Sequence, residues 1–107
     1  MKLSQRLIKE KTDPFFNQWT ILKEVIENSH RLRDSKGQHA MADGIILYKN
    51  LLQQCDNQIT PLNGQERLMF IEQRPSNYAA FRQLDELFAE MKKLIASKRV
   101  QLKRLEE

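Results

Sequence analysis

The fold of this chain is decided by residues 77–105, NYAAFRQLDELFAEMKKLIASKRVQLKRL. Apolar side chains recur there at strict intervals of three and four residues, at Phe81, Leu84, Phe88, Met91 and Ile95. This spacing places them on one side of an α-helix, because the helix repeats every 3.6 residues. The segment therefore predicts an amphipathic helix about 43 Å long, at about 1.5 Å per residue.

Three earlier segments show the same periodicity and predict helices over 14–33, 38–55 and 64–73. The dipeptide Asp13-Pro14 predicts the start of the first, because proline suits the first helical position. Asn63 and Glu66 have the spacing of a capping box at the start of the third, and Pro75 ends it. Residues 1–12 predict a short or frayed helix. No run alternates apolar and polar residues, so no strand is expected.

These elements predict an all-α fold: an antiparallel helical bundle of three long helices plus one short helix packed across one end. A chain of 107 residues with 40% hydrophobic residues makes one domain, 1–107. Helix 14–33 is too short to cover all of helix 77–105, so residues 98–107 are expected to overhang. Gly44, inside helix 38–55, either lets a neighbour approach closely or is simply tolerated, at up to about 1 kcal/mol relative to alanine.

The composition favours a soluble, cytoplasmic protein. No apolar run approaches the roughly 18 residues of a membrane span, and the N-terminus lacks the apolar stretch of a signal peptide. Cys55 is the only cysteine, which predicts no internal disulfide and a buried, inert thiol.

The net charge of +4 is concentrated at the two ends of the chain. Residues 1–12 carry a net +3 and residues 98–107 a net +2, so the segment between them is near neutral. Any basic footprint for nucleic acid must therefore be built from the two termini. A solvated helix end is the alternative, because cations in the last turns of a helix oppose the negative end of its dipole.

The residues that carry chemistry in other proteins do not converge in this sequence. Glu86 and Glu90 share a helix face, but Arg82 and Lys93 are spaced to form ordinary ion pairs with them. His30 and His39 are too few for a typical zinc site, and phosphate loops and nucleophile elbows are absent. We therefore expect no catalytic, cofactor or metal residues, and a protein that is not an enzyme.

Residues 63–93 carry the most distinctive pattern, E-R-L-x-F-I, then R-P, then Y-x-x-F-x-Q-L-x-x-L. In this pattern the segment resembles the YpoC-like family of small helical proteins from Gram-positive bacteria, with Trp19 as further support. The resemblance implies a bacterial, cytoplasmic helical domain and no particular activity.

The other predicted helices are too short to cover the end of helix 77–105, which carries apolar and basic side chains. We therefore expect a protein–protein interaction module that binds another protein or a second copy of itself. The alternative is a nucleic-acid-binding accessory factor that uses the basic ends. Arg67, Arg74 and Tyr78 are either a structural corner or an interface patch, since Arg and Tyr are favoured at interfaces. The full set of candidate contact residues is Arg67, Arg74, Tyr78, Lys98, Arg99, Val100, Leu102, Lys103 and Arg104.

Overall fold

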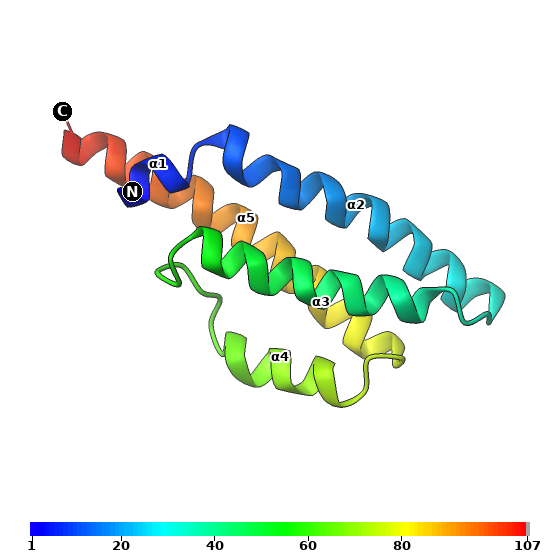
Figure 1. Cartoon of the computed structure of the whole chain (residues 1–107). Coiled ribbons are helices and arrows are strands. Elements are labelled where there is room, and N and C mark those ends of the chain that lie inside the picture. The colour runs from blue at the N-terminus through cyan, green and yellow to red at the C-terminus, as the bar shows by residue number, and fades with distance from the viewer. Residues whose placement is uncertain (107) are drawn as a thin grey trace.

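Five α-helices make up the computed structural model, which describes residues 1–106 (Figure 1). They are α1 (Leu3–Arg6), α2 (Lys9–Leu32), α3 (Gly37–Gln54), α4 (Gly64–Gln73) and α5 (Tyr78–Glu106). No strand occurs within these 106 residues, so the all-α prediction is confirmed. The bounds of α3, α4 and α5 agree with the predicted ones to within a residue at each end.

The start of α2 was predicted wrongly, because the helix begins at Lys9 and not at Pro14. Pro14 lies inside the helix, where a proline loses one backbone hydrogen bond and costs about 3 kcal/mol. The preceding turn is held by contacts with α5: Thr12 is fully buried, and its hydroxyl accepts a hydrogen bond from Arg99. These tertiary contacts outweigh the local preference of Asp13-Pro14 for a helix start.

The turn between α2 and α3 brings the two helices into close antiparallel contact (Figure 1). Arg33 ends α2 in the left-handed region, with φ 55°. The Ser29 hydroxyl then donates to the Asp34 carbonyl at 2.8 Å and accepts from the Gly37 backbone N–H at 2.9 Å. A Cβ at Gly37 would lie 2.8 Å from the Ser29 side chain, so this junction requires glycine.

The short helix α4 lies alongside α5 and runs in the opposite direction, so α2 to α5 alternate in direction (Figure 1). The predicted placement of this helix across one end of the bundle was wrong. Residues 74–77 reverse the chain, and the Asn77 side chain accepts the Ala79 backbone N–H at 3.0 Å at the start of α5. A reversal this short makes consecutive helices antiparallel neighbours.

Trp19 and Gly44 lie at the centre of the bundle. The Trp19 ring stacks on Phe88 with centroids 4.5 Å apart, and its Nε1–H donates to Asp85 Oδ1 at 3.0 Å. A Cβ at Gly44 would lie 2.7 Å from Trp19 Cζ3, so Gly44 allows the indole to approach α3 closely. The buried apolar core around them is Leu7, Ile26, Ala40, Met41, Leu47, Tyr48, Leu51, Cys55, Ile59, Ile71, Ala80, Phe81, Leu84, Leu87, Phe88, Met91 and Ile95.

The bundle is elongated, with a longest dimension of 52 Å. The last turns of α5 extend past the N-terminal helix α1 at one end (Figure 1). Through residue 106, none of the helices is both long and apolar enough to span a membrane.

Candidate functional site

The two basic ends of the chain meet at one end of the bundle, where α1 contacts α5 (Figure 1). The Arg99 guanidinium of α5 joins them, because it donates to the Leu7 carbonyl and to the Thr12 hydroxyl. Leu7 and Thr12 are both fully buried, and hydrogen bonds that involve a charged group are stronger than neutral ones. The basic segment 1–12 and the described part of the basic C-terminal segment, residues 98–106, therefore lie in contact at this end of the bundle.

Arg6 fastens α1 to the end of α3. Its guanidinium donates to the carbonyls of Gln53 at 3.2 Å and Gln54 at 3.3 Å, and the Gln54 side-chain amide donates back to the Arg6 carbonyl at 2.9 Å. A cation at this place satisfies carbonyls that lack a helical partner and opposes the negative end of the α3 dipole. Arg6 and Arg99 therefore hold the fold together.

The end of α5 leaves some of the predicted contact residues on the surface and turns others inward. Arg99 points into the molecule, and Leu102 is half-buried against the core. Val100 is 50% exposed and Leu105 is 83% exposed. Lys98 is half-buried, whereas Lys103 and Arg104 are exposed. The accessible surface here combines apolar side chains with basic ones.

Arg67 forms a structural corner between α4 and α5. Its Nη1 donates to Glu90 Oε1 at 3.0 Å while its Nη2 binds Glu90 Oε2, which makes a bidentate ion pair. It also donates to Gln83 Oε1 at 2.9 Å and to the Leu62 carbonyl at 3.1 Å. With 18% of its side chain exposed, Arg67 is committed to these contacts and is not a free interface residue.

The α5 carboxylates Glu86 and Glu90 pair with Arg67 of α4, and not with the partners on α5 that the sequence predicted. Arg67 pairs with Glu90, and its Nη2 lies 4.0 Å from Glu86, so neither carboxylate needs the predicted partner on its own helix. The hydrogen bonds from Arg67 hold the pKa of Glu90 below its usual value, and those to Glu90 raise the pKa of Arg67. Both groups are therefore charged at neutral pH.

Arg74 and Tyr78 do not share a patch with the side chain of Arg67. Arg74 is exposed after the end of α4, and Tyr78 is 50% exposed. The Tyr78 ring meets His30 edge to face with centroids 5.1 Å apart, and Phe81 lies behind it at 5.7 Å. Arg74 and Tyr78 are therefore the two predicted contact residues left exposed where the chain passes from α4 to α5.

The family described as YpoC-like protein matches this chain over residues 9–103. The chain belongs to the YpoC-like family. The match covers α2 to most of α5, well beyond the residues 63–93 that carry the resemblance. Comparison with curated proteins and comparison with solved structures each give no match.

In this YpoC-like chain, residues 1–106 contain no group of three or more His, Cys, Asp or Glu side chains placed to hold a metal ion. Cys55 is fully buried, as predicted. Burial raises the pKa of its thiol to about 11, against the opposing effect of Arg99 and Arg6, because the buried thiolate is poorly solvated. The thiol is therefore protonated at neutral pH and is a poor nucleophile.

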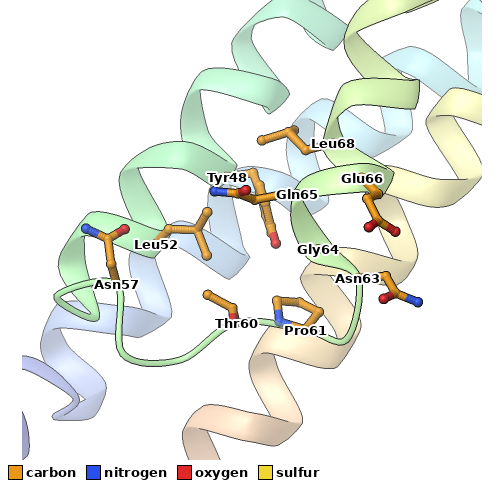
Figure 2. A pocket seen from close by; sticks show the side chains of 10 residues that line it. All are labelled: Tyr48, Leu52, Asn57, Thr60, Pro61, Asn63, Gly64, Gln65, Glu66 and Leu68. Carbon is orange, nitrogen blue, oxygen red and sulfur yellow. The ribbon is translucent and has the colours of Figure 1, made fainter.

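A cavity of about 460 Å³ that the sequence does not predict lies between the end of α3, the loop that follows it and the first turn of α4 (Figure 2). Its apolar walls are Leu52, Pro61 and Leu68. Its polar lining includes Tyr48, a residue that is 1% exposed and whose ring belongs to the core. Helical periodicity carried no signal for this cavity, because it depends on the path of the loop 55–63.

Proposed function

We propose that this YpoC-like protein is a non-catalytic interaction protein that binds another protein through the basic end of the bundle, formed by α1 and the last turns of α5. The observation that supports this function is the uncovered continuation of the core stripe of α5. Leu102 still packs against the core, but Leu105, three residues later, is 83% exposed. An exposed apolar surface rimmed by polar residues is typical of interaction sites.

The charge at this end favours an acidic partner. Segments 1–12 and 98–107 carry net charges of +3 and +2, and Lys103 and Arg104 are exposed beside the apolar side chains. Complementary charge speeds association and selects partners, whereas two copies that present the same basic end repel each other. Light scattering at micromolar concentration is therefore expected to give a monomer, and a stable dimer would favour self-association.

Two matched substitutions test the docking surface. Leu105→Asp adds a charge to the uncovered stripe, and Ile21→Asp, at a residue 66% exposed on α2, is the control. We expect quantitative capture from a lysate of the native cell to recover a protein with the wild type and with Ile21→Asp but not with Leu105→Asp. Loss with Ile21→Asp alone would place the docking surface on α2.

Nucleic-acid binding is the second candidate, and the contact between α1 and α5 supports it by placing both basic segments together. A labelled oligonucleotide should then bind at about 50 mM salt and weaken steeply as salt increases. The double substitution Lys103→Glu, Arg104→Glu should weaken binding, whereas Arg33→Glu, Lys36→Glu, at the α2–α3 turn, should not. No change in fluorescence anisotropy at low salt would exclude this candidate.

A further inference from the structure

The hydroxyl of Tyr48 has no partner within residues 1–106 and keeps access to solvent, whereas the rest of the residue is buried. The residue is 1% exposed, and its hydroxyl makes no hydrogen bond with any residue in the described part of the chain. Its ring is fixed against Phe88, with centroids 5.5 Å apart in an edge-to-face contact. A hydroxyl without a protein partner is free to donate a hydrogen bond to a molecule that binds beside it.

The unpaired hydroxyl faces the 460 Å³ cavity. Figure 2 shows the oxygen of Tyr48 directed towards the space between Leu52, Pro61 and Gly64. Gly64 leaves this path open, because a Cβ built on it would lie 3.8 Å from the Tyr48 hydroxyl oxygen and 3.5 Å from Pro61 Cδ. The cavity therefore gives a bound molecule access to the hydroxyl.

The start of α4 has two further backbone donors next to the same cavity. Asn63 has a left-handed backbone, with φ 56°, and its side chain makes no capping hydrogen bond, so the predicted capping box does not form. The backbone N–H of Gly64 donates to the Pro61 carbonyl and that of Arg67 to the Asn63 carbonyl. Those of Gln65 and Glu66, between them, have no acceptor within residues 1–106. Both residues line the cavity.

The charges around the cavity argue against an anionic ligand. Glu66 is the only charged residue in its lining, and the neighbouring charge of Arg67 is already paired with Glu90. Burial raises the pKa of Tyr48 to about 12, so its hydroxyl is a neutral donor at physiological pH. The donors therefore call for an acceptor oxygen that carries no full charge, and the apolar walls for a hydrocarbon group beside it.

We propose that this cavity binds a small uncharged molecule that carries a carbonyl oxygen next to an apolar group, with Tyr48 and the first turn of α4 as the hydrogen-bond donors. The site is separate from the docking surface at the end of α5. A result that overturns ligand binding in this cavity therefore leaves the proposed interaction function untouched, and the reverse also holds.

A set of three probes that share a cyclohexyl ring and differ in charge tests the proposal on the full chain. N-cyclohexylacetamide carries a neutral carbonyl, cyclohexanecarboxylate is its anionic counterpart, and cyclohexylamine is cationic at neutral pH. Titration followed by ¹⁵N–¹H NMR should show saturable shifts of the Gln65 and Glu66 amides with the acetamide and weaker binding of the two charged probes. Tighter binding of the carboxylate would overturn the assigned ligand class, and no saturable shift at these amides would overturn the site.

Two tyrosine variants separate the hydroxyl from the fold. Tyr48→Phe removes only an unpartnered group, so its NMR spectrum should show a folded protein. Its affinity for the acetamide should fall about tenfold, which corresponds to one hydrogen bond of about 1.4 kcal/mol. Tyr78→Phe, at the exposed tyrosine outside the cavity, is the control and should bind as the wild type does. Equal affinity of Tyr48→Phe and wild type would refute the role of the hydroxyl.

Discussion

Replacing Gly44 by alanine tests the central packing of the bundle, because two opposing effects act at this residue. Alanine favours a helix interior over glycine by about 1 kcal/mol. The new Cβ, however, would lie 2.7 Å from Trp19 Cζ3 and 3.3 Å from Leu84 Cδ2. The indole cannot move away freely, since it stacks on Phe88 and its N–H is bound to Asp85. Overpacking of a fixed core group costs about 1–3 kcal/mol.

The net expectation is that Gly44→Ala destabilises the protein by about 1 kcal/mol, a fall in Tm of about 4–8 °C for a domain of this size. Urea and thermal unfolding followed by circular dichroism measure both quantities. Gly64→Ala is the matched control, because its nearest neighbours would lie at 3.5 Å and 3.8 Å. It should be at least as stable as wild type. A Gly44→Ala variant as stable as Gly64→Ala would refute the close approach of Trp19.

Three further perturbations test the polar contacts that hold the helices. Glu90→Gln should lower the free energy of unfolding at pH 7. Because the pKa of Glu90 is depressed in the folded state, the difference in unfolding free energy between variant and wild type should shrink as the pH falls through the folded-state pKa. Urea unfolding between pH 7 and pH 3 measures this difference. Asp85→Ala should lower the free energy of unfolding by about 1–3 kcal/mol, because it leaves the Trp19 N–H buried and unpaired. The fluorescence emission of Trp19, the single tryptophan, should change as well. Asp85→Asn should lower the free energy of unfolding less, because an acceptor oxygen remains. Arg99→Met should speed hydrogen exchange in residues 3–12 and leave α3 and α4 unchanged, and equal exchange in both proteins would contradict the proposed role of Arg99.

Periodicity predicted the elements whose boundaries are set locally. The bounds of α3 to α5 followed from apolar spacing and from Arg74-Pro75, which stops α4 whatever its neighbours are. The resemblance seen in residues 63–93 likewise led to the family that matches residues 9–103. These features lie within single helices or single turns.

The errors arose where distant residues decide the outcome. Thr12 and Arg99 are 87 residues apart, yet their contact stabilises the first turn of α2, so the helix begins at Lys9 and includes Pro14. Arg67 of α4 binds the carboxylate of Glu90 on α5, whereas spacing along the chain favoured an ion pair of Glu90 with Lys93. The cavity at Tyr48 depends on the loop 55–63, whose left-handed Asp56, Asn57 and Asn63 no apolar pattern predicts.

The claim on which the proposed interaction surface depends is that α1 docks on α5 and unites the two basic ends of the chain. NMR of the full chain in solution tests it most directly, through nuclear Overhauser contacts of the Arg99 side chain. We predict contacts from Arg99 to Leu7 and to Thr12, together with a slowly exchanging Arg99 Nε–H. Absence of these contacts, with the amides of residues 1–12 exchanging as in an unfolded peptide, would contradict it.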